Sequence, residues 1–101
     1  MAFAITHFFK GATKEQYDRS LRAVHPAGGL PKGQIYHVAG TSPGGVTIFA
    51  VHDSRKSWET FRDTILTPAM QKGIEGGMQG APAETDIEVF NLQAAKAPET
   101  A

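Results

Sequence analysis

Two neighbouring segments, Gln34 to Thr41 and Val46 to His52, alternate along their length without placing a charged side chain on either face. The turn Ser42-Pro43-Gly44-Gly45 between them predicts a β-hairpin in which Thr41 pairs with Val46. Residues opposite one another in an antiparallel pair point to the same side, so one face carries Ile35, His37, Ala39, Val46, Ile48, Ala50 and His52. The other face carries Tyr36, Val38, Gly40, Thr47, Phe49 and Val51. A sheet with one face in water shows polar residues at alternate positions, and neither list does, so we expect both faces to be covered.

The segment before the hairpin predicts a strand, a helix and a loop. Ala2 to Phe9 alternates without charge on either side, and we expect a strand buried on both faces. Thr13 and Gln16 have the spacing of a capping box. They begin a helix that runs to Val24, whose apolar residues recur at helical spacing as Tyr17, Leu21 and Val24. Two prolines and three glycines between His25 and Gly33 predict a loop.

The segment after the hairpin predicts more helix and a last strand. Asp53 or Ser54 is placed to cap a helix with an inward stripe made of Trp58, Phe61 and Ile65. Thr67-Pro68 interrupts that helix and predicts a new helical segment, capped by Thr67, that carries Met70 and Ile74 inward and ends at Gly76-Gly77. We expect a final strand over Thr85 to Leu92.

The predicted order of strand, helix, strand, strand, helix, strand defines an α+β fold. Right-handed crossovers give a ferredoxin-like βαββαβ domain with a four-stranded antiparallel sheet and its helices on one side. We assign residues 1–93 to this single domain and 94–101 to a flexible C-terminal tail. Two helices cover only one face of the sheet, yet every strand has apolar residues on both. The second face therefore predicts a homodimer, sheet against sheet about a two-fold axis.

Two stretches of the sequence resemble a known superfamily. The strand-to-helix segment from Ile48 to Phe61 and the later Thr67-Pro68-Ala69-Met70, in this order of elements, are similar to the dimeric α+β barrel proteins, which include antibiotic-biosynthesis-monooxygenase-like members. The resemblance covers roughly residues 2–92, and its motifs carry fold rather than function. It implies a dimeric α+β barrel with a pocket in each subunit between sheet and helices. Members of this superfamily include cofactor-free oxygenases, haem-degrading enzymes and lactone isomerases.

Haem-degrading members use a histidine on the second helix and an asparagine on the first strand. This chain has no histidine between Asp53 and Gly77 and no asparagine in the first strand, so haem degradation is not expected. The four histidines show no i, i+4 or HxH spacing, and we expect no metal. The glycine pairs fit no phosphate-binding pattern, and no GxSxG motif is present. We expect no cofactor.

Charge and composition narrow the class of partner. The chain has 10 basic and 10 acidic side chains and no cysteine. It lacks the excess positive charge that would attract nucleic acid or an anionic membrane. The longest apolar runs are shorter than the ~20 residues of a membrane helix, and the start does not resemble a signal peptide. We therefore expect a cytoplasmic homodimer that binds a small hydrophobic molecule.

The histidines are the candidate chemical groups, because they titrate near neutral pH. His37 is our candidate catalytic base, and His7, Tyr36, His52 and Trp58 are candidate ligand-binding residues. Such a site suits a cofactor-free monooxygenase or isomerase acting on a small aromatic or carbonyl metabolite. The alternative is a non-catalytic ligand-binding or interaction module in which the histidines pack in the core or in an interface. The two differ in whether His37 lines a cavity or points into a subunit interface.

Overall fold

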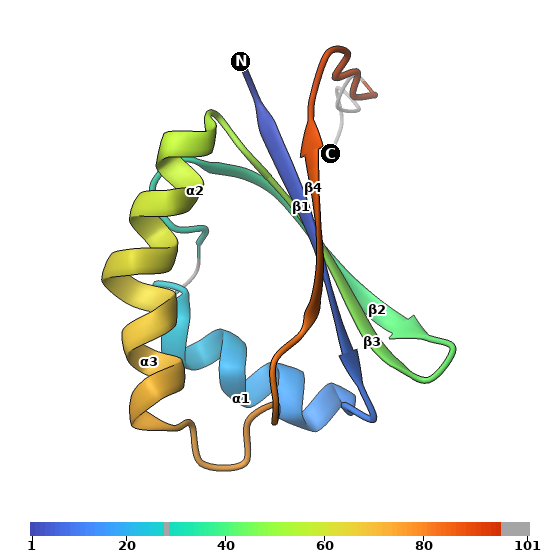
Figure 1. Ribbon diagram of the computed structural model, residues 1–101, viewed down its shortest axis with the longest axis vertical. Coiled ribbons are helices and arrows are strands. Elements are labelled where there is room, and N and C mark those ends of the chain that lie inside the picture. Colours follow the sequence, from blue (N-terminus) through green and yellow to red (C-terminus); the bar gives the residue numbers. More distant parts are fainter. Residues whose placement is uncertain (28, 96–101) are drawn as a thin grey trace, which may run out of the picture.

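The computed structural model describes residues 1–27 and 29–95 of the chain. A four-stranded antiparallel sheet has the order β2-β3-β1-β4, and the helices all lie on one of its faces (Figure 1). The elements are β1 (Phe3–Lys10), α1 (Lys14–Val24), β2 (Gln34–Ser42), β3 (Gly45–His52), α2 (Arg55–Phe61), η1 (Arg62–Leu66), α3 (Thr67–Lys72) and β4 (Ala83–Glu88). The predicted ferredoxin-like βαββαβ fold is confirmed.

The hairpin has the predicted register over most of its length. Thr41 lies opposite Val46 and His37 opposite Ala50. A bulge between Gln34 and Tyr36 then inserts Ile35 as an extra residue, so that Gln34 pairs with His52. The prediction that Ile35 shares the face of His37 is therefore wrong, and Gln34 takes that place.

Side-chain hydrogen bonds cap the N-termini of α1 and α2. Thr13 caps α1 with a complete capping box, in which its Oγ1 accepts from the Gln16 N–H and the Gln16 side chain accepts from the Thr13 N–H. The Ser54 Oγ accepts from the Ser57 N–H at the start of α2, so Ser54 rather than Asp53 is the cap. Both contacts use residues within three positions, which is why the sequence predicts them.

The second helical region differs from the prediction at Thr67-Pro68. The helix continues there through one π-helical turn, η1, in which the Thr67 N–H donates to the Arg62 carbonyl. Pro68 has no N–H to donate to the carbonyl four residues earlier, so a widened turn accommodates it. The extra residue rotates the helix, so that Leu66 packs against the core while Ile65 is exposed. Helix α3 then ends at Gly73, at φ 90°, rather than at Gly76-Gly77.

The last strand is an edge strand that is shorter and earlier than predicted. β4 pairs only with β1, and its last pair joins Glu88 to Phe3, the first residue of β1. The Val89 N–H still donates to the carbonyl of Ala2, which precedes β1, but the strand ends before it, and Phe90 is almost fully exposed. The assignment of a strand as far as Leu92 is therefore wrong. The predicted tail lies, from residue 96 onward, outside the described residues.

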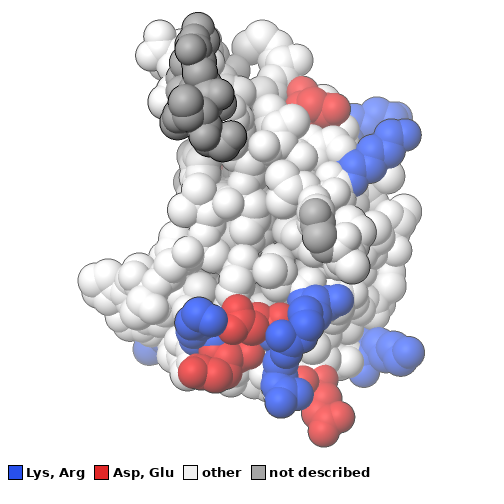
Figure 2. Space-filling model, turned by 180° about the vertical axis from the view of Figure 1, so that it is seen from behind, with Lys and Arg blue, Asp and Glu red and all other residues white. Residues whose placement is uncertain are grey.

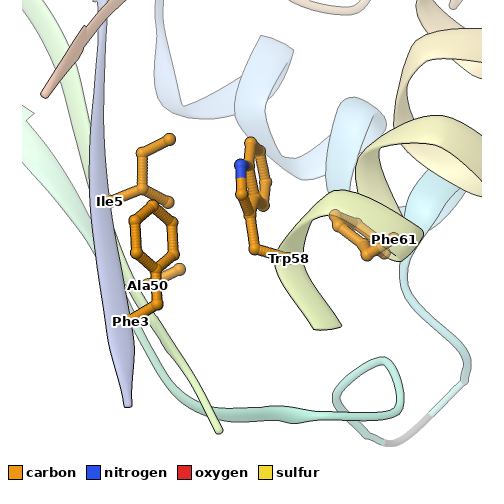
Figure 3. Close-up of a cluster of buried hydrophobic side chains, with 5 residues drawn as sticks. All are labelled: Phe3, Ile5, Ala50, Trp58 and Phe61. Carbon is orange, nitrogen blue, oxygen red and sulfur yellow. The ribbon is translucent and has the colours of Figure 1, made fainter. Parts of the chain in front are cut away.

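The core lies between the sheet and α2. Figure 3 shows Phe3, Ile5 and Ala50 on the sheet side, with Trp58 and Phe61 projecting from α2 toward them. All five are buried. Among the described residues, no helix is both long enough and apolar enough to span a membrane.

The opposite face of the sheet is almost free of charge. Its residues alternate with those of the core face, and Lys10 at the end of β1 is the one charged residue among the strand residues on this side. Val38 is 61% exposed, with Tyr36 and Ile87 also exposed, whereas Ala4 and Val51 at one end are buried. Figure 2 views the molecule from behind, with the sheet nearly edge-on, and shows charged side chains gathered over the end where α1 lies.

Candidate functional site

A cavity of about 480 Å³ lies between the sheet and the helices. This volume is within the range of small-molecule sites, roughly 300–1,000 Å³. Ile48 and Ala50 of β3 line it from the sheet, and residues of α1, α2 and α3 line it from the other side. Gly80, Ala81 and Glu84, which are exposed, place its mouth near the segment that enters β4. All four histidines of the chain also line this cavity.

His37 is the centre of a hydrogen-bonded chain of three side chains. Its Nδ1 lies 2.8 Å from Oε1 of Gln34, and its Nε2 lies 2.6 Å from the hydroxyl of Tyr17 on α1. The amide oxygen of Gln34 can only accept, so Nδ1 carries the hydrogen and Nε2 accepts from the Tyr17 hydroxyl. The β-bulge at Ile35 makes this chain possible, since it brings Gln34 to the face of His37.

A second pair, His7 on β1 and Glu84 on β4, lies on the other side of β3 from His37. Nε2 of His7 donates to Oε2 of Glu84 at 2.8 Å, from β1 to the edge strand β4. The ring of His7 is buried and lies 5.4 Å from the Trp58 ring, whereas Glu84 is half exposed. His37 lies on β2 and His7 on β1, with β3 between them. Two strand spacings separate β2 from β1, which is roughly 10 Å. The cavity therefore has polar groups on two sides of an apolar floor.

His52 is the deepest of the four histidines. It is fully buried, and neither of its ring nitrogens has a hydrogen-bond partner among the described residues. Its ring lies 5.5 Å from that of Trp58 and 6.2 Å from that of Phe61. A buried imidazole without partners costs folding free energy, and such groups in native proteins often mark functional positions.

Burial keeps the histidines neutral at pH 7. The pKa of each is lowered from the usual 6.5, and removal of the ring from water is the largest cause in every case. For His25, whose ring lies 4.8 Å from that of His37, burial together with His37 and His52 lowers the pKa to about 4. Glu84 opposes the lowering of the pKa at His7 without reversing it. Burial and the nearby Asp18 raise the pKa of Tyr17.

The structure places four of the five residues predicted for the site at one cavity. His7, His37, His52 and Trp58 line it. Tyr36 does not, because it lies on the opposite face of the sheet. Sequence reasoning missed the polar partners of the site, which are Tyr17 as a hydroxyl donor, Gln34, Glu84 and His25. Within the described residues, no group of three or more metal-ligating side chains comes together.

The arrangement of strands and helices around this cavity is the ferredoxin-like α+β fold, and the comparison with solved structures shows that fold alone. Two solved structures share it. A "putative antibiotic biosynthesis monooxygenase" from Chloroflexus aurantiacus J-10-fl has a TM-score of 0.61 at 20% identity, and the match covers 93% of this chain and 98% of that one. Rv0793 from Mycobacterium tuberculosis has a TM-score of 0.62 at 13% identity, with 92% and 98% covered. No protein-family model matches the sequence, and no curated protein matches it.

Proposed function

We propose that the chain binds a small aromatic or carbonyl-bearing molecule in the cavity and removes an acidic proton from it, as a cofactor-free monooxygenase or isomerase. The observation that carries this proposal is the position of His37, which lines an apolar cavity together with Trp58. A base held neutral at pH 7 is able to accept a proton there. Its lowered pKa makes it a weaker base than free imidazole, so the substrate must carry a proton as acidic as that of a phenol or of carbon next to a carbonyl.

The product formed after proton removal depends on whether the substrate anion reacts with a proton or with dioxygen. If the proton returns at another carbon, the product is an isomer and nothing is consumed. If dioxygen reacts instead, one of its oxygen atoms enters the substrate as a carbonyl, and the other leaves as water with two hydrogens from the substrate: both from one carbon of a CH₂ group, or one from the hydroxyl and one from a ring carbon of a phenol. The Chloroflexus protein is described as a monooxygenase, and at 20% identity this chain shares its fold, which favours the second outcome without determining it.

A binding module without catalysis is the second candidate function. It is favoured by one observation: both ring nitrogens of His37 already have partners within the chain. In that case Tyr17 and Gln34 hold the histidine as a structural element, and the ligand meets only apolar walls.

Deuterium exchange into 2-tetralone distinguishes catalysis from binding alone. This compound is flat and aromatic, and it has acidic hydrogens next to its carbonyl. We expect the protein to accelerate their exchange in D₂O above the buffer rate, and we expect His37→Gln to reduce the acceleration by about 100-fold or more. Proton NMR measures the exchange, and thermal shift with the same compound shows that the variant still binds. Binding without acceleration by the unmodified protein would support the module, and undiminished exchange in His37→Gln would remove His37 as the base.

A homodimer through the uncharged sheet face is the second part of the proposal. The surface of the sheet that faces away from the helices supports it. Tyr36, Val38 and Ile87 are all exposed there, and its strands contribute one charged residue. A two-fold pairing brings this nearly uncharged surface onto itself, with Lys10 as the one charged strand residue of each copy. It would also cover apolar area of the kind that monomers rarely leave in water.

A further inference from the structure

We propose that Tyr17 is the catalytic residue that meets the substrate, and that it passes the substrate's proton to His37, while Gln34 is the positioning residue that keeps His37 able to receive it. This inference rests on the proposed function and assigns the groups that carry it out. It changes the role of His37 from a base in contact with the substrate to a base that acts through a phenol.

The hydrogen bonds of His37 leave it no free lone pair. The imidazole has two ring nitrogens; Nδ1 donates to Gln34 Oε1 at 2.8 Å, and Nε2 accepts from the Tyr17 hydroxyl at 2.6 Å. A ligand could reach Nε2 only by displacing that hydroxyl. The Tyr17 oxygen, by contrast, keeps a lone pair after donating its hydrogen, and Tyr17 is a partly exposed residue of the cavity wall.

The proton transfer balances through these three side chains. A substrate proton moves to the free lone pair of the Tyr17 oxygen as the original phenolic proton moves to His37 Nε2. Tyr17 ends neutral, the substrate becomes an anion, and His37 becomes an imidazolium with hydrogens on both nitrogens. Nδ1–H still donates to Gln34, so no hydrogen bond is lost. The reverse transfer returns a proton to the substrate, or to the product formed from it.

Gln34 determines which tautomer His37 adopts. Gln34 is 7% exposed and lies across from His52, on the face of the sheet that the helices cover. Its Oε1 accepts the Nδ1 hydrogen, and this leaves the lone pair on Nε2, toward Tyr17. With the hydrogen on Nε2 instead, the imidazole would have to donate to Tyr17 and could not take up its proton there. The β-bulge at Ile35 sets this arrangement, because without it Gln34 would point to the opposite face.

The two tyrosines of the chain form a matched pair for the test. Tyr17→Phe removes the hydroxyl at the cavity, and Tyr36→Phe removes one from the opposite face of the sheet. In the 2-tetralone exchange assay we expect Tyr17→Phe to lose about 100-fold of the acceleration and Tyr36→Phe to retain it. Equal rates in the two variants would overturn the role of Tyr17 and leave the proposed function standing. An unmodified protein that does not accelerate exchange would instead overturn the proposed function.

Gln34 is tested by measurements that a merely structural role would not change. Nitrogen NMR of the imidazole ring should find His37 with its hydrogen on Nδ1 in the unmodified protein, and Gln34→Leu should lose that preference and the acceleration together. Gln34→Glu keeps the acceptor and adds a negative charge beside His37, which raises the pKa of the imidazole. The acid limb of the pH profile for exchange should therefore move to higher pH in Gln34→Glu. An unchanged tautomer in Gln34→Leu, or an unshifted acid limb in Gln34→Glu, would contradict the positioning role.

Discussion

A Val38→Glu variant should sediment as a monomer at concentrations where the unmodified chain sediments as a dimer. Val38 is 61% exposed in the uncharged face of the sheet, on β2 beside β3. Closing two copies over this face would bury a carboxylate on each side without a partner, because Lys10 lies at the far end of β1. Taking a charge out of water in this way costs several kcal/mol per ion, which corresponds to a loss of more than about 100-fold in affinity.

Sedimentation velocity over a concentration series measures this change. Ala23→Glu is the matched control, since it adds the same charge at an exposed position of α1, in the helix layer. We expect the control to remain a dimer. An unmodified chain that stays monomeric across the series would contradict the homodimer, and a Val38→Glu variant that still dimerises would move the interface to another surface.

Acidification should weaken the fold through its buried histidines. The pKa of His25 is about 4 in the folded protein and 6.5 in a freely hydrated ring. Between these values the unfolded chain binds the proton and the folded chain does not, so the free energy of unfolding falls as the pH drops from 6.5 toward 4. A fully buried ring with this shift would contribute about 3 kcal/mol, but His25 is only partly buried and solvent screening reduces this to about 1–2 kcal/mol. The lowered pKa values of His7, His37 and His52 act in the same direction.

Urea unfolding at about pH 7 and about pH 4.5 separates the share of His25 from the rest. His25→Gln removes the titrating ring while its backbone N–H still donates to the Leu21 carbonyl at the end of α1. We expect the unmodified protein to lose about 1–2 kcal/mol more than this variant between the two pH values. Equal losses would show that His25 does not resist protonation in the folded state.

The sequence predicts those parts of the fold that depend on neighbouring residues. The turn at Pro43-Gly44 sets the pairing of Thr41 with Val46, and the capping box needs only Thr13 and Gln16. The alternation along the strands predicts the sheet, but both of its faces are apolar, so the pattern does not indicate which face the helices cover. Each of these signals is complete within a few residues or repeats with a fixed period.

Two parts of the fold that the sequence did not predict each depend on one inserted residue. A bulge at Ile35 exchanges the face of Gln34, and a π-helical turn exchanges Ile65 for Leu66 at the core. An insertion of this kind has no period, and it shifts every residue on one side of it. Pro68 is a signal for the second insertion, because it cannot take part in the ordinary helical ladder.

The candidate site also has residues that the sequence predicts and residues that it does not. His37 and His52 follow from alternation along the hairpin, and Trp58 follows from helical spacing. The partners of the histidines do not, because Glu84 lies 77 residues from His7 and Tyr17 lies 20 residues from His37. These contacts join a helix to a strand, or two strands distant in sequence. They depend on how those elements pack against each other, and a local sequence pattern does not show this.

Titration of the protein with 2-tetralone, followed by the NMR signals of the histidine rings, tests most directly whether this cavity binds an aromatic carbonyl compound. We predict saturable shifts of His37 and His7, which lie on two sides of the cavity floor, and the loss of these shifts in Leu21→Trp, which fills the cavity from α1. Unchanged histidine signals at saturating compound, or shifts that survive in Leu21→Trp, would show that the ligand site lies elsewhere.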